Sequence, residues 1–234
     1  MRRLLPPPVE EIPDEGLPAL FAFASTSPWV RGSMVSTLDG AMRGRDGSSR
    51  SIATAADRAV FSLLRRDCDV VLVGAGTVRD ERYSPSMHPI AVVTRTLDLP
   101  ASLPLFADRD ERTPRTLALT TARAAAQPPT TPSPTLEVIV CGDTDVDLVL
   151  AIDTLVQRGL CRIHCEGGPT LLGSLAAADL LDEMLLTVTP LLVGAPPADH
   201  IVAVERGFEP PMHLTTTQVL EEDGTVFLRA SRLP

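Results

Sequence analysis

The stretch HCEGGPTLLGSL, residues 164–175, places an acidic residue, two glycines and a proline between an apolar run and a helical pattern. Glycine lets a backbone approach a ligand closely, and proline suits the first turn of a helix. The free N–H groups at the start of that helix, together with its dipole, favour a bound phosphate. The alternative is a tight strand-to-helix turn with nothing bound, because short glycine motifs also occur without function.

A second corner of this kind lies in DVVLVGAGTVRDE, where Gly74, Gly76 and Thr77 follow an apolar run. We expect the threonine hydroxyl to cap the helix that follows. The Rossmann fingerprint does not fit, because its third glycine would fall at Arg79. No acid stands about 20 residues further on at a strand end, where that fingerprint needs one to hold a ribose hydroxyl.

Thr94 and Arg95 end the next apolar run along the chain. A guanidinium at that place suits the 2′-phosphate of NADPH better than the bare ribose of NADH. A single arginine is more often a solvated surface residue, which is the alternative here. The two glycine corners and this hydroxyl–arginine pair together favour a dinucleotide, and specifically NADPH, as the cofactor.

Two carboxylates stand where strands are expected to end. Asp39 closes the strand-like WVRGSMVSTLDG and either meets a polar substrate or forms a plain Asp-Gly turn. Glu166 follows a buried strand, where a carboxylate needs a partner that an internal arginine would supply. Asp57 is interpreted as part of a helix cap, and Arg65 as a charge that complements the dipole at the end of the same helix.

Several reaction classes are excluded by what the sequence lacks. All 21 basic residues are arginine, and without lysine there is no Schiff base, no pyridoxal phosphate attachment and no P-loop lysine. His164-Cys165-Glu166 matches the H-x-E of zinc deaminases, but no P-C-x-x-C follows it. No G-x-S-x-G elbow and no other zinc-type spacing occurs, so we expect neither a serine hydrolase nor a metal site.

The composition is typical of a soluble globular protein with an acidic balance. The 234 residues carry a net charge of −9, and one Trp, one Tyr and six Phe provide no stacking platform for nucleic-acid bases. No apolar stretch approaches the ~20 residues of a membrane helix, and prolines and acids interrupt the start MRRLLPPPVEE. The four cysteines lie in or beside apolar runs, as free thiols in a reducing compartment do. We therefore expect a cytoplasmic protein that binds a small molecule, not nucleic acid or a membrane.

These candidate residues require strands and helices that alternate along the chain. Helices are predicted from a capping pattern at Thr54 and from an apolar stripe over 145–158 that ends at Gly159. Apolar runs predict buried strands at 29–40, 69–74, 90–94, 116–120, 136–142, 159–166 and 183–194, and a terminal hairpin at 213–220 and 224–230. The pattern indicates an α/β fold in three layers, with a mostly parallel sheet and a C-terminal antiparallel hairpin. Residues 1–28 are predicted to be an irregular proline-rich extension, and residues 29–234 one domain.

The motifs MVSTLDG, LLRRDCDVVLVGAGTVRDE, AVVTR and EGGPTLLGSL…LLDEMLLTVTPLLVG occur in one order and at one spacing over residues 29–230. In these motifs the chain resembles the reductase domain of bifunctional riboflavin-biosynthesis proteins, and its stand-alone members in particular. The resemblance implies a dihydrofolate-reductase-like fold, a homodimer, and NADPH-dependent reduction of a phosphorylated ribosylaminopyrimidine, whose ribose is opened to a ribityl chain.

The resemblance also implies roles for individual residues. Substrate contacts would be Ser49, Arg65 and Glu166, with Asp39 beside the reacting carbon as the catalytic residue. Cofactor contacts would be Val35, Ser51, Gly74, Gly76, Thr77, Glu81, Thr94, Arg95, Gly167, Gly168, Pro169, Thr170 and Leu171.

The loop at residues 78–89 departs from the family pattern. The family has D-D-P-x-L-T-x-R after the T-V corner, and its Leu and Arg hold the substrate, whereas this chain has Pro85 and His88 in those places. A part-time histidine charge binds phosphate less well than a guanidinium. The phosphorylated substrate is therefore expected to be poor unless another arginine, such as Arg79 or Arg82, replaces the missing contact. Two alternatives stay open, a reductase of folates or pterins and a nucleotide-binding protein without catalysis.

Overall fold

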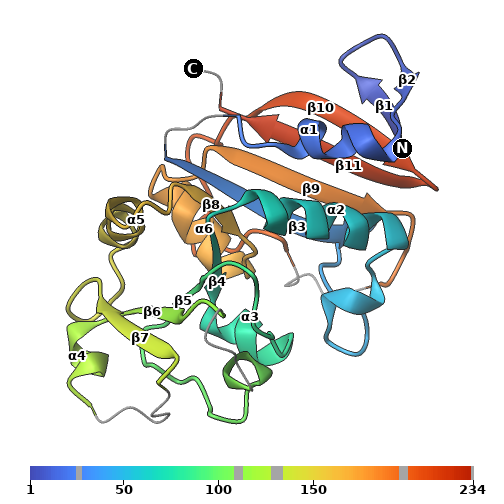
Figure 1. The fold of residues 1–234 in the computed structure, drawn as a ribbon. Helices are drawn as coiled ribbons and strands as arrows, with labels where there is room; N and C mark the ends of the chain where they lie inside the picture. The colour runs from blue at the N-terminus through green and yellow to red at the C-terminus, as the bar shows by residue number, and fades with distance from the viewer. Residues whose placement is uncertain (25–27, 108–112, 128–133, 195–199, 233–234) are drawn as a thin grey trace.

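The computed structural model describes residues 1–24, 28–107, 113–127, 134–194 and 200–232. Within them one eleven-stranded sheet has the order β2-β1-β10-β11-β9-β3-β8-β4-β5-β6-β7. The strands are β1 Arg2–Leu5, β2 Glu10–Glu11, β3 Trp29–Thr37, β4 Val70–Gly74, β5 Ile90–Val93, β6 Thr116–Thr120, β7 Leu136–Val140, β8 Arg162–Cys165, β9 Glu183–Thr189, β10 Thr215–Glu222 and β11 Thr225–Ser231. The seven from β9 to β7 pair in parallel, and the remaining pairs are antiparallel (Figure 1).

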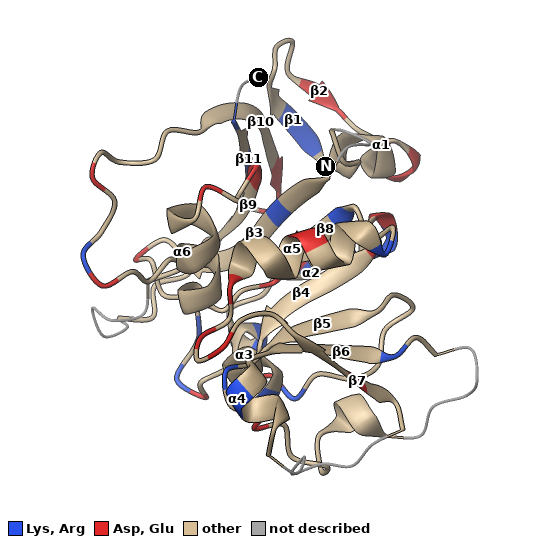
Figure 2. Ribbon diagram, turned by 90° about the vertical axis from the view of Figure 1, so that its left-hand side faces the viewer, with Lys and Arg blue, Asp and Glu red and all other residues tan. Residues whose placement is uncertain are grey.

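Helices cover both faces of this sheet (Figures 1 and 2). They are α1 Leu17–Phe21, α2 Ala55–Asp67, α3 Ala75–Asp80, α4 Ala122–Ala125, α5 Leu148–Gln157 and α6 Pro169–Ala177, with short 3-10 turns η1 Asp14–Gly16, η2 Ser49–Ser51 and η3 Pro104–Phe106. Side chains of a strand alternate between the faces. Val70 and Leu72 of β4 therefore pack with α5 and α6, whereas Val71 and Val73 pack with α3 and α4. The predicted three-layer α/β fold with a C-terminal hairpin is confirmed.

Helix α2 forms where the capping pattern predicts it. The Thr54 side chain accepts a hydrogen bond from the Asp57 backbone N–H at 3.2 Å, and Val60 and Leu64 turn into the core beside Phe227 of β11. Arg65 lies in the last turn of α2, as expected for a cation near a helix C-terminus. The helix thus has a buried stripe toward the sheet and carries Arg65 at its end nearest β8.

The prediction of irregular structure for residues 1–28 is wrong in its described part. Strand β1 pairs antiparallel with β10 and so extends the main sheet, and α1 packs beside α2. The buried Arg31 of β3 anchors this segment, because its guanidinium donates to the Phe21 carbonyl at 2.7 Å and to the Ala22 carbonyl at 2.9 Å. Glu183 of β9 is the ion-pair partner of Arg31. Among the described helices none is long and apolar enough to cross a membrane.

Candidate functional site

The two glycine corners lie side by side at the carboxyl edge of the parallel strands. Strand β4 has β8 on one side and β5 on the other, and its Gly74 is in register with Val93. The Gly74 backbone N–H donates to the Gly167 carbonyl at 2.8 Å, so one corner is hydrogen-bonded to the other. In open α/β sheets this edge is where ligands bind.

The backbone of the second corner needs its glycines. Gly167 has φ +81°, and the peptide bond between Gly167 and Gly168 is cis. A Cβ added at Gly168 would lie 2.7 Å from the Thr77 Oγ1, which is closer than side chains pack. Gly168 is the N-cap of α6 with Pro169 in the first turn, and no side chain caps this helix start. The predicted bare corner is confirmed as geometry.

The expectation that Thr77 caps helix α3 is wrong. Gly74 is the N-cap, no side chain caps this helix start, and Thr77 lies inside the first turn. Its hydroxyl instead points across to Gly168 of the neighbouring corner. The first-turn N–H groups of both helices are therefore free of side-chain caps, and the Thr77 hydroxyl of one corner lies against Gly168 of the other.

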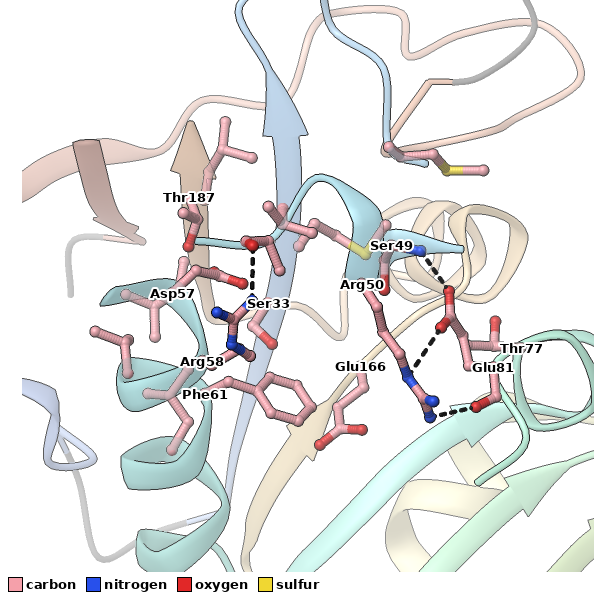
Figure 3. Close-up of a pocket in the computed structure, with 18 of the residues that line it drawn as sticks. Ser33, Ser49, Arg50, Asp57, Arg58, Phe61, Thr77, Glu81, Glu166 and Thr187 are labelled. Atoms are coloured by element: carbon pink, nitrogen blue, oxygen red, sulfur yellow. Dashed lines mark hydrogen bonds and ion pairs between the residues drawn. The ribbon is translucent and has the colours of Figure 1, made fainter. Parts of the chain in front are cut away.

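A cavity of about 500 Å³ opens beside these corners, between α2, β3, η2 and α3 (Figure 3). It has the size of a small-molecule site. Its lining includes eight of the expected residues: Val35, Ser49, Arg65, Thr77, Glu81, Glu166, Gly168 and Pro169. The other expected residues lie outside this lining: Asp39, Ser51, Gly74, Gly76, Thr94, Arg95, Gly167, Thr170 and Leu171. Their assignments stay predictions, as do those of the eight.

Glu166 lies in the cavity wall with two strong partners. The Arg65 guanidinium donates to it twice, from Nε to Oε1 at 2.6 Å and from Nη2 to Oε2 at 2.7 Å. The Tyr83 hydroxyl also donates to Oε2, and Arg65 stacks over the Phe61 ring at 4.6 Å. The internal arginine expected from sequence is thus Arg65, which the sequence analysis had interpreted as a charge at the helix end and, through the resemblance, as a substrate contact.

Electrostatics follow from the burial of this cluster. Burial lowers the pKa of Arg65, but hydrogen bonds and charge from Glu166 outweigh it, so the pKa lies above its ordinary value. Burial and the Glu166 charge raise the pKa of Tyr83, which keeps its hydroxyl a donor. His164, fully buried with its Nε2 3.2 Å from the Ser33 Oγ and 3.7 Å from Glu166, has its pKa lowered to about 4 by burial. It is neutral at physiological pH.

Glu81 binds the turn η2 to α3. Its carboxylate accepts from the Ser48 hydroxyl at 2.9 Å and from the Ser49 backbone N–H at 2.8 Å. Arg50 donates to the Glu81 carbonyl at 2.8 Å and leaves most of its side chain exposed at the cavity (Figure 3). Ser51 turns away and donates to Asp46 at 2.6 Å.

Asp39 lies at the exposed end of β3, apart from Glu166. Its carboxylate accepts from the Val193 backbone N–H at 3.1 Å, from the Gly194 N–H at 2.6 Å and from the Thr37 hydroxyl. These hydrogen bonds, that of Thr37 foremost, lower the pKa of Asp39. Its position orders the segment after β9, and its assignment beside the reacting carbon stays a prediction.

Thr94 and Arg95 follow β5 at the same edge as the corners. Thr94 is buried, and its carbonyl accepts from the Thr120 hydroxyl at 2.6 Å. The Arg95 guanidinium is 3.3 Å from Asp145 in a pair whose side chains are 70% and 77% exposed. Such a pair contributes little, so Arg95 can exchange it for another anion.

Sequence reasoning missed several residues of the cavity. Tyr83, the only tyrosine of the chain, falls in the loop that departs from the family pattern, and that departure was the available signal. Asp57 was interpreted as a helix cap, but Thr54 makes the cap with its side chain, and the Asp57 carboxyl lines the cavity. The lining also holds Arg43, Arg50 and Arg58, whereas Arg79, Arg82 and His88 are not part of it.

In the described part of the chain, no group of three or more His, Cys, Asp or Glu side chains is placed so that it could hold a metal ion. All four cysteines are free thiols, as expected, with Cys161 partly exposed and the others buried. On β8 the side chains alternate, so His164 faces Glu166 and Cys165 enters the opposite core. Only the middle residue of the H-x-E match, Cys165, is therefore separated from the other two.

Comparisons with known proteins agree on one family. The model of the RibD C-terminal domain matches residues 28–226. A relative from Methanothermobacter thermautotrophicus, named 2,5-diamino-6-ribosylamino-4(3H)-pyrimidinone 5′-phosphate reductase, is 30% identical over 75% of this chain and 83% of its own length. A protein of the same name from Archaeoglobus fulgidus is 27% identical over 71% of this chain and 82% of its own.

Solved structures share the fold. A pyrimidine reductase-like protein from Corynebacterium diphtheriae superposes with a TM-score of 0.73 at 21% identity, over 88% of this chain and 92% of that one. A diaminohydroxyphosphoribosylaminopyrimidine deaminase/5-amino-6-(5-phosphoribosylamino)uracil reductase from Thermotoga maritima gives 0.70 at 19% identity, over 88% and 57%. The α/β fold of these pyrimidine reductase structures, which the resemblance implied for this chain, is confirmed.

Proposed function

This chain belongs to the RibD C-terminal domain family, and on that premise we propose that it is an NADPH-dependent reductase of a phosphorylated ribosylaminopyrimidine. The observation that carries the proposal is the meeting of two uncapped glycine corners at the edge of one cavity that also contains Glu166 and Arg65. The corners suit the phosphates of a nucleotide, and the cavity suits a polar ring.

The residues present fit a dinucleotide at the carboxyl edge of the sheet. The close approach of Gly168 to Thr77 leaves no room for a side chain there, and the first turns of α3 and α6 have no side-chain caps. Their N–H groups suit the phosphates, and Arg95 suits the 2′-phosphate. NADPH, when bound, supplies the hydride, and the protein supplies binding and orientation.

The side chains of the cavity are suited to holding a substrate still. Hydrogen bonds join Arg65, Glu166 and Tyr83 into a cluster that forms a polar wall of the cavity. In this Arg65–Glu166–Tyr83 cluster, Arg65 and Tyr83 both hold the Glu166 side chain in one orientation. Orientation of this kind contributes much of the rate in a reaction whose chemistry the cofactor supplies. Arg50, which lines the cavity with most of its side chain exposed, is the proposed phosphate contact in place of the arginine that His88 replaces.

The activity is tested by following NADPH oxidation with phosphorylated and dephosphorylated ribosylaminopyrimidines and with dihydrofolate. We expect turnover with the pyrimidines and a loss of about tenfold or more in kcat/KM when Arg50 is replaced by Gln, for the phosphorylated substrate only. Turnover of dihydrofolate alone would replace this proposal by a folate reductase, and no turnover of any substrate would favour a binding protein.

Cofactor preference is tested at Arg95. A charge-assisted contact with phosphate is worth about 1.5–3 kcal/mol, so the protein should bind NADPH at least tenfold more tightly than NADH. Calorimetric titration of Arg95→Ala should show that preference lost. The matched variant Asp145→Asn removes the competing carboxylate and should keep or increase the preference. Equal affinities of the unmodified protein for both cofactors would contradict the assignment.

The homodimer belongs to this proposal through the family resemblance, and the cytoplasmic location through the composition of the sequence and its cysteines. Light scattering after size-exclusion chromatography measures the first, and a monomer at micromolar concentration would contradict it. Fractionation of the source cells measures the second.

A further inference from the structure

The carboxylates of the cavity differ in how far their hydrogen-bonding capacity is used. Glu166 accepts from a guanidinium and a phenol, and Glu81 accepts from a hydroxyl and a backbone N–H. Asp57, in the first turn of α2, accepts at its carboxylate from the Thr187 hydroxyl of β9. Most of the acceptor capacity of Asp57 is therefore available to a ligand.

The surroundings of Asp57 favour a ligand that donates hydrogen bonds. Its side chain is half-buried, and burial raises its pKa in spite of the Thr187 hydrogen bond and the Arg58 charge. The Arg58 guanidinium donates to the Ala53 carbonyl at 2.8 Å, so its nearest cation is already engaged with the backbone. In Figure 3 Asp57 and Thr187 stand on one wall of the cavity, with Glu81 and Thr77 on the other.

We propose that the Asp57 carboxylate accepts hydrogen bonds from the N3–H and 2-amino groups of a 2-aminopyrimidinone, and thereby makes the enzyme prefer that ring to the corresponding uracil. This inference rests on the proposed function and specifies its substrate class. Two parallel donors on a planar edge match the two oxygens of a carboxylate, as a guanidinium does.

The uracil edge has the wrong pattern for this carboxylate. Its C2 carbonyl is an acceptor beside N3–H, so one carboxylate oxygen would gain a hydrogen bond and the other would face an acceptor. A ring that leaves the carboxylate of a half-buried site unpaired loses more binding free energy than a ring that differs only in size. Both ring types occur in the names of the similar proteins, the 2-amino ring in the archaeal relatives and uracil in the Thermotoga maritima structure.

The experiment compares kcat/KM for 2,5-diamino-6-ribosylamino-4(3H)-pyrimidinone 5′-phosphate and for 5-amino-6-(5-phosphoribosylamino)uracil. The unmodified protein should prefer the diamino ring by about tenfold or more. Asp57→Asn should reverse the preference, because an amide donates to the C2 carbonyl and accepts from N3–H. A merely structural role would lower both values together and would not reverse their ratio.

Two further variants keep the test decisive. Asp80→Asn removes an exposed carboxylate from the same lining and should leave the ratio unchanged. Thr187→Val removes the hydroxyl that orients Asp57 and should reduce the preference without reversing it, which also serves if Asp57→Asn does not fold. A ratio near one in the unmodified protein, or an unchanged ratio in Asp57→Asn, would overturn the proposal.

Failure of the proposed function gives a different result. If neither pyrimidine is reduced with NADPH, calorimetric binding of the two pyrimidines to the unmodified protein and to Asp57→Asn still measures ring preference. Tighter binding of the diamino ring, reversed in the variant, supports the role of Asp57 in a protein that is not this reductase. Equal binding of both rings, or binding of neither, overturns it.

Discussion

The glycine corners and the Arg65–Glu166–Tyr83 cluster are neighbours built by opposite means. The corners, at Gly74–Thr77 and Gly167–Pro169, are joined by a backbone hydrogen bond, and a side chain at Gly168 would collide with Thr77. The cluster is made of side chains that neutralise and orient one another. The comparison indicates that a mutation should damage the corners by adding atoms and the cluster by removing charge.

The largest effect is expected at Glu166→Gln. Breaking a buried ion pair from one side costs about 3–5 kcal/mol, and the Glu166 side chain is 2% exposed beside Arg65. Urea denaturation should show this loss, while NADPH affinity changes less than about threefold if the two regions are energetically separate. The matched variant Glu81→Gln loses hydrogen bonds from two neutral donors and a 3.9 Å contact with the exposed Arg50 guanidinium, and should cost about 1 kcal/mol. A parallel fall in cofactor affinity for Glu166→Gln would break the comparison.

The second effect concerns His164, which lies 3.7 Å from Glu166 of the cluster and should make the stability of the protein depend on pH. Its pKa is about 4 in the folded protein against 6.5 ordinarily, because burial disfavours the charged ring. As the pH falls below 6.5, the unfolded chain binds a proton that the folded chain does not. Stability due to this residue is thus complete above 6.5 and falls by about 1.4 kcal/mol per pH unit toward 4, or about 2 kcal/mol between pH 6.5 and 5.

The measurement is the free energy of unfolding at several pH values in that window. His164→Gln, which cannot titrate at this position, should flatten the dependence. The same slope in the unmodified protein and in His164→Gln would assign the dependence to other groups.

The two regions also differ in how far the sequence predicts them. Glycine and proline act locally, so the corners could be located from single motifs, and parallel strands bring their carboxyl ends together by rule. Arg65 and Glu166 are 101 residues apart in the chain, and neither motif alone predicts that the other residue is its ion-pair partner. Strand β1 was missed for the same reason, since a short run just before three prolines becomes a strand only by pairing with β10. The local pattern around Asp57 predicts a helix cap, and only the fold places this residue in the lining of the cavity.

The smallest effect concerns two glycines of the corners. A Cβ at Gly168 would lie 2.7 Å from the Thr77 Oγ1, on a stiff β-branched side chain, whereas a Cβ at Gly76 meets nothing within 4 Å. Gly168→Ala should therefore cost about 1–2 kcal/mol of stability, and Gly76→Ala should cost nothing or add up to about 1 kcal/mol, because alanine favours a helix. In a Thr77→Ala background the cost at Gly168 should fall by half or more, since the clashing oxygen is gone. Thermal denaturation of the four single and double variants measures this coupling. Equal costs at both glycines would show that the corners are ordinary turns whose closeness has no energetic consequence.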